Sequence, residues 1–337
     1  MDGAEPAERE RRMKVAIIGA GAIGGYIGGM LAQAGGDVTL LARGRQLEAI
    51  QANGLVIEAD GERFTVRPAC TDDPAKIGKQ DYLIVTLKAP ALPALAPRLA
   101  PLLGSDTAIV TAMNGIPYWY FHGHDGALAG RQLGSIDPDG LPWKSLPPER
   151  AVGGVLWLPA AVPEPGLIRR GNGNRLTLGE PDGSLSPRLK ALAEMLQAAG
   201  IEAPATANIR QEIWLKLWGN LSFSPVSVLT HNTLSDIGGD PGTKQIVGAM
   251  MREAQAVGEA LGIRFPISVE ERIEESRKIG PHKPSMLQDL EAGRPMEIEA
   301  ITGVIAELAR LLGLPTPTID LVLALVRSRA KAAETAV

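Results

Sequence analysis

The sequence predicts an α/β domain followed by a smaller, all-helical domain, and three observations indicate this. Strand-like and helix-like runs alternate through the first half of the chain, which is typical of a mostly parallel sheet covered by helices. A glycine-rich turn joins the first strand to the first helix. From Asn208 onward the apolar pattern is helical almost throughout. A chain of 337 residues is long enough for two such domains.

The expected domain limits follow from these changes of pattern. Residues 1–12 are charged and lack apolar periodicity, which indicates a disordered leader ahead of a second potential start at Met13. We predict the α/β domain at 13–207 and the helical domain at 208–337. Asn208 is a candidate N-cap, and Gln211, three residues later, would complete a capping box.

The first strand and helix carry the strongest motif. The strand Lys14–Ile18 leads into three glycines with the G-x-G-x-x-G spacing, a helix at 22–34 and a second strand at Asp37–Leu41. In a Rossmann-type domain these glycines allow a tight turn, close approach of a pyrophosphate and close helix packing, and the helix N-terminus attracts phosphate. We therefore predict a dinucleotide-binding loop formed by Gly19, Ala20, Gly21, Ala22, Ile23 and Gly24.

Two other interpretations of this stretch are weaker. The basic residues before an apolar, small-residue run are similar to a secretory signal peptide. The pairs Gly21/Gly25 and Gly25/Gly29 are similar to a transmembrane dimer face. Neither explains the strand pattern that begins again at Asp37.

The end of the second strand indicates which dinucleotide binds. An acidic residue there would favour NAD, because it binds the ribose 2′-hydroxyl, whereas NADP sites often carry arginine. The chain has Arg43 and Arg45 at this place and no carboxylate. Arg43 can stack on adenine and pair with a phosphate, so we expect NADP(H). The alternative is that both arginines are solvated surface residues.

Composition limits the partners and the compartment. The formal net charge is −4 and no basic stripe is evident, which argues against nucleic acid as a partner. The single cysteine, Cys70, has no intramolecular disulfide partner, and without a credible signal peptide or membrane span this favours a reducing cytoplasm. Cys70 is expected to be an inert structural thiol. The four histidines lack metal-ligand spacing, so no metal site is predicted.

The remaining elements follow from local patterns. We expect strands at 82–87, 107–112, 151–159 and 176–179, and helices near 46–53, 91–103 and 186–199. A long excursion rich in glycine, proline and aromatic residues lies at 118–148 and is a candidate functional loop. In the second domain we expect helices at 209–228, 242–262, 269–277, 285–291, 297–312 and 318–332, with a break at Gly293-Arg294-Pro295.

Several polar residues are expected at the crevice between the domains. Lys88 and Asn114 follow two buried-type strands, and ligands of open α/β sheets bind outside the carboxyl ends of strands. Lys88 could instead be a surface lysine, and Asn114 a turn residue. Lys216 and Asn220 are four residues apart and share one face of an otherwise apolar helix, where a buried lysine needs a partner.

Two further polar residues flank the break in the last third of the chain. Ser285 precedes Gly293-Arg294-Pro295, and Glu297 follows it at the start of a helix that then turns apolar. Because a carboxylate at a helix start is favoured by the helix dipole, Glu297 also has a purely structural interpretation.

Taken together and in order, these segments resemble the ketopantoate reductase (2-dehydropantoate 2-reductase) family over Met13 to Arg329. The resemblance implies a Rossmann domain followed by a helical domain. The motifs that carry it are Gly19–Gly24, Val85-Thr-Leu-Lys88, Asn114-Gly115, Lys216-x-x-x-Asn220 and His282-Lys-Pro-Ser-Met-Leu-Gln-Asp289 followed by Glu297-Ile298.

The resemblance also implies roles for single residues. Lys216 matches the catalytic lysine, and Glu297 matches the glutamate of the substrate site, which we group with it as catalytic. Lys88 matches a lysine near cofactor and substrate. The positions expected to bind substrate are Asn114, Asn220 and Ser285, with Asn114 also expected at the cofactor.

The chain departs from the family pattern in two places. The family usually repeats the helix asparagine four residues after Asn220, where this chain has Ser224, which we retain as a substrate-binding candidate. The loop after Asn114 is longer and more aromatic, beginning with Tyr118-Trp-Tyr-Phe121. Both features lie where a substrate would be recognised.

The implied function is NADPH-dependent reduction of 2-dehydropantoate to pantoate, as in pantothenate and coenzyme A biosynthesis. One alternative is a related reductase of a different, bulkier or aromatic 2-oxo acid. Another is a non-catalytic NADP(H)-binding redox sensor, which would not need Lys216 and Glu297. The expected partner is a small 2-oxo acid, and a homodimer formed through the helical domain is left open.

Overall fold

Seven strands form the central sheet of the N-terminal half, in the order β11-β8-β7-β6-β1-β2-β5. Neighbouring strands are parallel except at the edge, where β11 is antiparallel to β8. The strands are β1 (Lys14–Ile18), β2 (Asp37–Leu41), β5 (Ala69–Thr71), β6 (Gln80–Val85), β7 (Leu103–Thr111), β8 (Ala151–Trp157) and β11 (Arg175–Gly179). Because the chain reverses its direction across the sheet between β1 and β6, their carboxyl ends form the crevice where ligands of such folds bind.

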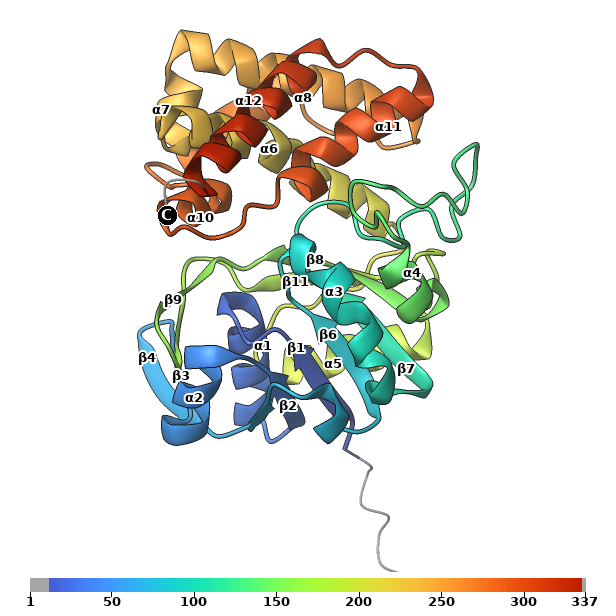
Figure 1. Cartoon of the computed structure of the whole chain (residues 1–337), viewed down its shortest axis with the longest axis vertical. Coiled ribbons are helices and arrows are strands. Elements are labelled where there is room, and N and C mark those ends of the chain that lie inside the picture. Colours follow the sequence, from blue (N-terminus) through green and yellow to red (C-terminus); the bar gives the residue numbers. More distant parts are fainter. Residues whose placement is uncertain (1–11, 335–337) are drawn as a thin grey trace, which may run out of the picture.

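The computed structural model describes residues 12–334. The helical half lies on the carboxyl-end side of the sheet, and helix α6 runs along the junction between the two halves (Figure 1). The predicted fold class, a Rossmann-type α/β domain followed by a helical domain, is confirmed. Residues 1–11, which hold most of the predicted leader, lie outside the described part of the chain.

A second sheet, which the sequence analysis missed, covers helix α1 (Ala22–Gln33). Its order is β4-β3-β10-β9, formed by β3 (Leu55–Ala59), β4 (Glu62–Val66), β9 (Ala160–Glu164) and β10 (Leu167–Arg170). A Cβ atom at Gly25 would lie 2.7 Å from Ile168 Cδ1, and one at Gly29 would lie 2.6 Å from Ile57 Cδ1. The small-residue face of α1 is therefore the docking face for this sheet.

The other helices of the α/β half support the main sheet. They are α2 (Gly44–Asn53), η1 (Pro74–Lys76), α4 (Leu141–Ser145), η4 (Pro148–Arg150) and α5 (Pro187–Ala198). The prediction of one continuous helix at 91–103 is wrong. This segment is divided into η2 (Ala89–Ala91), α3 (Leu92–Leu95) and η3 (Ala96–Leu102), because its prolines lack the N–H groups that a longer α-helix needs.

The helical half consists of α6 (Ile209–Thr230), α7 (Leu234–Gly239), α8 (Pro241–Ala260), α9 (Val269–Lys278), α10 (Ser285–Glu291), η5 (Glu299–Gly303), α11 (Val304–Leu312) and α12 (Pro317–Glu334). Helix α7 was not predicted. Of the predicted capping box, the Asn208 side-chain cap forms and the return bond from Gln211 does not. Asn208 caps α6 by accepting from the Gln211 N–H at 3.2 Å, but the Gln211 side chain bonds to the backbone of Arg264 instead. Among residues 12–334, no helix is long and apolar enough to cross a membrane.

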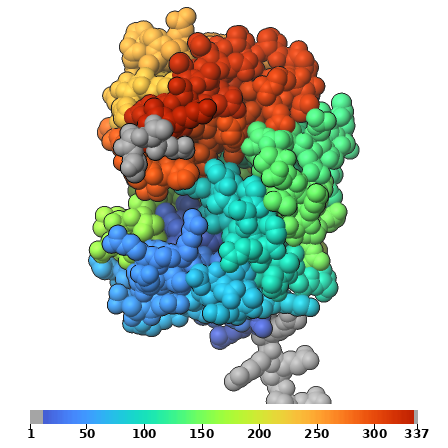
Figure 2. Space-filling model, viewed as in Figure 1, coloured from blue at the N-terminus to red at the C-terminus, as the bar shows by residue number. Residues whose placement is uncertain are grey.

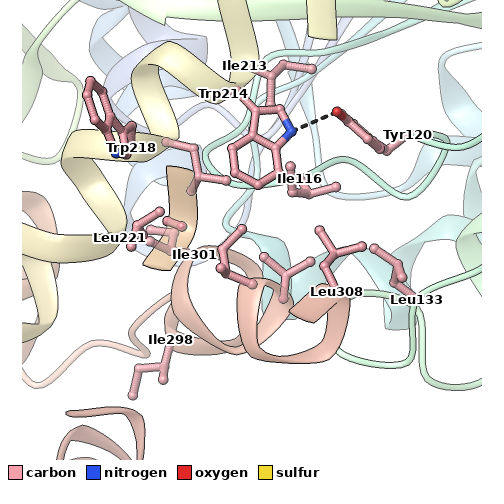
Figure 3. Packing of buried hydrophobic residues seen from close by; sticks show 14 of the residues in the cluster. Ile116, Tyr120, Leu133, Ile213, Trp214, Trp218, Leu221, Ile298, Ile301 and Leu308 are labelled. Atoms are coloured by element: carbon pink, nitrogen blue, oxygen red, sulfur yellow. Dashed lines mark hydrogen bonds between the residues drawn. The ribbon is translucent and has the colours of Figure 1, made fainter. Parts of the chain in front are cut away.

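The aromatic start of the 118–148 segment belongs largely to the core. Trp119, Tyr120 and Phe121 are fully buried. The indole N–H of Trp119 donates to Thr111 Oγ1 at 2.8 Å, and that of Trp214 on α6 donates to the Tyr120 hydroxyl at 2.7 Å. Figure 3 shows this second bond beside the apolar side chains packed between α6 and α11. These contacts dock the segment onto β7 and α6.

We expect two tyrosines of this segment to differ in their effect on stability. Tyr120→Phe removes the acceptor for the buried Trp214 N–H, so the free energy of unfolding should fall by about 1–3 kcal/mol. Tyr118→Phe removes a buried hydroxyl that has no hydrogen-bond partner among residues 12–334, so stability should not fall. Urea unfolding of both variants measures this difference, and equal losses would contradict it.

Candidate active site

The glycine loop has the geometry of a phosphate-binding turn. Gly19 has a φ of +104°, which favours glycine, and a Cβ atom at Gly24 would lie 2.1 Å from the Gly19 carbonyl oxygen. Gly21, by contrast, faces open space, because a Cβ atom there would meet no described residue within 4 Å, its chain neighbours and its own helix aside. Within the described residues, no side chain caps the α1 N-terminus and its first turn carries no acid. The free N–H groups of α1 and the open space beside Gly21 fit a dinucleotide pyrophosphate.

The two candidate 2′-phosphate ligands lie at the end of β2. Arg43 is the N-cap residue of α2, and both Arg43 and Arg45 are exposed. The main chain here is tied to the glycine loop, because the N–H groups of Gly19 and Ala20 both donate to the Leu41 carbonyl, at 3.1 and 3.2 Å. Because both arginines are exposed, their side chains are accessible to a ligand that approaches this loop from solvent.

Lys88 links the two halves of the molecule. It follows β6, and its ammonium group forms an ion pair with Asp289 of α10 and donates to the Pro295 carbonyl at 3.3 Å. Asp289 is buried and also accepts from Arg294 Nε at 3.1 Å. The location predicted for Lys88, at the carboxyl end of its strand, therefore lies directly beside the helical domain.

Glu297 is the central polar residue of the junction. Its side chain is buried. The residue lies in the chain just before the π-helical turn η5. One carboxylate oxygen accepts from the Ala89 N–H and the other from the Asn114 amide, both at 3.1 Å. Burial raises the pKa of Glu297, and these two donors oppose that shift. The carboxylate therefore holds two loops of the α/β half against the helical half.

The loop that carries Asn114 makes a second close contact with the helical half. Gly115 has a φ of +85°, and a Cβ atom there would lie 2.1 Å from the Ala300 carbonyl oxygen. The Ile116 N–H donates to the same oxygen at 3.3 Å. Only glycine fits at position 115, and π-helical turns such as the one around Ala300 often occur at functional sites.

Lys216 projects from α6 toward the end of β8. Its ammonium group donates to the Leu156 carbonyl at 2.7 Å. Burial lowers the pKa of Lys216 to about 8, while the charge of Glu297 opposes this shift. An amine with such a pKa is mostly protonated at neutral pH and yet can release its proton readily.

Two adjoining cavities lie beside these residues. The first, which we call the lysine cavity, is lined by Met113, Asn114, Gly115, Val155, Ile213, Lys216, Leu217 and Asn220, and its empty space of about 230 Å³ includes open solvent. The second, which we call the side chamber, has about 470 Å³ of empty space, which includes open solvent, and is lined by Ala89, Leu92, Thr111, Met113, Asn114, Gly115, Ile116, Pro117, Tyr118, Ile136, Gly154 and Ile213. Figure 2 shows the recess between the α/β and helical halves on one face of the molecule.

The structure brings together only part of the predicted substrate-binding set. Asn114, Lys216 and Asn220 line the lysine cavity, and Glu297 bonds to Asn114 at its edge. Ser224 is buried one turn beyond Asn220 on α6, and Ser285 is exposed at the first turn of α10. Neither serine is among the described residues that line the two cavities.

Sequence reasoning missed several groups of the site. The Ala89 N–H and the Leu156 carbonyl are backbone groups, which leave no signal in a side-chain pattern. Asp289 lies within a motif that we quoted, but its pairing with Lys88 depends on the approach of the two domains. Of the four consecutive aromatic residues at 118–121, Tyr118 alone lines either of these two cavities, and a role of this run in recognising substrate stays a prediction.

Comparison with known proteins identifies the class of enzyme to which this site belongs. The family described as Ketopantoate reductase PanE/ApbA matches residues 15–183, and its C-terminal counterpart matches residues 208–330. The chain is 51% identical over 316 residues to a 2-dehydropantoate 2-reductase from Mesorhizobium japonicum, covering 94% of this chain and 97% of that protein. The chain therefore belongs to the ketopantoate reductase family.

Solved structures agree with this assignment. A candidate ketopantoate reductase from Ralstonia solanacearum MolK2 superimposes with a TM-score of 0.91 at 43% identity, covering 96% of this chain and 99% of that one. A D-mandelate dehydrogenase solved with NADH and anilino(oxo)acetate has a TM-score of 0.82 at 24% identity, covering 95% and 99% of the two chains. At 24% identity, the similarity to the D-mandelate dehydrogenase shows only that the two chains share a fold.

Proposed function

We propose that this chain reduces 2-dehydropantoate to pantoate with NADPH. The observation that supports this most directly is the placement of Lys216, with its lowered pKa, in a cavity beside Asn114, Asn220 and the carboxylate of Glu297. The 51% identity to a 2-dehydropantoate 2-reductase supports the same reaction and substrate. A redox sensor without catalysis would not require a half-buried lysine and a buried carboxylate at this place.

The cofactor site is proposed from the glycine loop and the arginines after β2. The open approach to Gly21 and the free N–H groups of α1 suit the pyrophosphate. Arg43 and Arg45, with no acid at the end of β2, suit the 2′-phosphate of NADP(H) rather than the free hydroxyl of NAD(H). The bound nicotinamide supplies the hydride that is added to the substrate carbonyl carbon.

Lys216 is the proposed proton donor. As hydride reaches the carbonyl carbon, negative charge develops on the carbonyl oxygen, and a neighbouring ammonium group stabilises this charge. Transfer of a proton from Lys216 Nζ to that oxygen then completes the alcohol. The Leu156 carbonyl orients the ammonium group, and the charge of Glu297 keeps it protonated.

The asparagines are proposed to position the substrate. Asn114 lines the cavity, and its amide nitrogen donates to Glu297 at 3.1 Å, which leaves the amide oxygen available as an acceptor. Asn220 lies one helical turn after Lys216 and lines the same cavity. Together they can hold the polar groups of a 2-oxo acid while Lys216 acts on its carbonyl.

Replacement of Lys216 tests the catalytic assignment. Lys216→Ala should lower kcat for 2-dehydropantoate about a hundred- to a thousandfold, because an oxyanion-stabilising donor is lost, while NADPH still binds. The measurement is NADPH oxidation at 340 nm together with NADPH binding by fluorescence titration. Lys244→Ala, an exposed lysine of α8, is the matched control and should keep full activity. Near-normal turnover by Lys216→Ala would contradict the proposed role.

Replacement of Arg43 tests the choice of cofactor. Arg43→Ala should weaken NADPH by about 1.5–3 kcal/mol, roughly ten- to a hundredfold in KM, because a charged hydrogen bond to the 2′-phosphate is lost. The KM for NADH should barely change, since NADH lacks that phosphate. Arg98→Ala on η3 serves as the control. Equal KM values for NADPH and NADH in the unmodified enzyme would refute this assignment.

A further inference from the structure

The peptide groups of the glycine loop must be correctly oriented before the loop can bind a phosphate. In a trans peptide the C=O and the N–H point to opposite sides, and no peptide bond in the described part of the chain is cis. N–H groups attract a phosphate, whereas a carbonyl oxygen turned toward it would repel it. The groups that hold the loop carbonyls therefore decide which side the N–H groups face.

Two side chains from outside the loop hold these carbonyls. Thr86 Oγ1 donates to the Gly19 carbonyl at 2.8 Å, and Gln46 Nε2 donates to the Ala20 carbonyl at 2.9 Å. Ala20 is buried and precedes Gly21, whose carbonyl accepts the first bond of α1, so the Ala20 carbonyl depends on a donor from elsewhere. With this carbonyl held, the Gly21 N–H points away from Gln46, and Gly21 borders open space.

Gln46 is itself held in one orientation by the second sheet. Its Oε1 accepts from the Gly166 N–H at 2.9 Å, in the turn between β9 and β10. The Gly166 carbonyl in turn accepts from the Val56 N–H of β3 at 2.8 Å. The amide of Gln46 therefore faces a carbonyl with its nitrogen and an N–H group with its oxygen, so its two ends cannot be exchanged. This side chain anchors the glycine loop to the second sheet.

Gln46 also lies in the first turn of α2, three residues after Arg43. Arg43 is the proposed ligand of the 2′-phosphate, so one helix carries both that ligand and the support of the glycine loop. The two functions are separable, because α2 is also held in place by Ile50, which is buried in the core. A change at Gln46 should therefore alter the glycine loop without displacing the helix that carries Arg43.

We propose that Gln46 is a positioning residue of the cofactor site, whose amide holds the Ala20 carbonyl away from the pyrophosphate and so directs the Gly21 N–H toward it. This inference rests on the proposed function, which assigns a dinucleotide to the glycine loop. A loop that is already fixed in its binding conformation loses less entropy when the ligand binds. Gln46 is not among the described residues that line the two cavities, so it should change the affinity for the cofactor and not kcat. NADPH and NADH share the pyrophosphate, so both should depend on Gln46 equally, whereas only NADPH should depend on Arg43.

A matched pair of glutamine variants on α2 tests the proposal. Gln46→Met keeps the length of the side chain but removes both of its hydrogen bonds. The dissociation constants of NADPH and NADH, measured by fluorescence titration, should rise by the same factor, about three- to thirtyfold, while kcat at saturating NADPH changes less than about twofold. Gln51→Met is the control, because it removes a bond from the same helix to the Cys70 carbonyl at 3.0 Å. This control should leave both dissociation constants unchanged.

A smaller ligand separates the glycine loop from the arginines. Adenosine 2′-monophosphate carries the 2′-phosphate but no pyrophosphate, so Gln46→Met should leave its dissociation constant unchanged, whereas Arg43→Ala should raise it. The inference is wrong if Gln46→Met binds NADPH as tightly as the unmodified protein, or if it weakens adenosine 2′-monophosphate as much as NADPH. A fall in kcat without a loss of affinity would contradict it as well. If the unmodified protein binds neither dinucleotide, the proposed function fails together with this inference.

Discussion

The buried carboxylate of Glu297 is the interaction on which the site depends. A carboxylate that leaves water loses several kcal/mol of hydration unless donors replace it. Here the donors are the Ala89 N–H and the Asn114 amide, both from loops of the α/β half, whereas Glu297 belongs to the helical half. The carboxylate is satisfied only when the two halves are in contact. Assembly of the interdomain surface and assembly of the polar site are therefore the same event.

The same carboxylate sets the electrostatics of the reaction. Burial lowers the pKa of Lys216, and the charge of Glu297 opposes that shift. The Leu156 carbonyl orients the ammonium group without adding a full charge that would hold the proton too strongly. Around this pair, the Lys88–Asp289 ion pair and the contact of Gly115 with Ala300 fix the remaining edges of the junction. The lysine thus remains charged next to the side chamber.

Much of this arrangement could be predicted from the sequence where the signal is local. Gly19 and Gly24 follow a strand at fixed spacing, and Lys216 and Asn220 share a helix face because they are four residues apart. The second sheet could not be predicted in the same way, because β3 pairs with β10 more than a hundred residues later in the chain. The partners of Glu297 and Lys216 include backbone groups, whose positions depend on the packing of two domains. The aromatic run at 118–121 was noticed, but the pattern does not distinguish Tyr118, which lines a cavity, from its three neighbours.

The dependence of Lys216 on Glu297 can be measured directly. The pKa of the Lys216 amine can be followed by NMR in protein carrying ¹³C-labelled lysine, with Lys216→Met used to assign the signal. We expect a pKa of about 8 in the unmodified protein. In Glu297→Gln the supporting negative charge is absent, so the pKa should be lower and the amine should lose its proton at a lower pH. An unchanged or higher pKa in Glu297→Gln would contradict the claim that this carboxylate keeps the catalytic lysine charged.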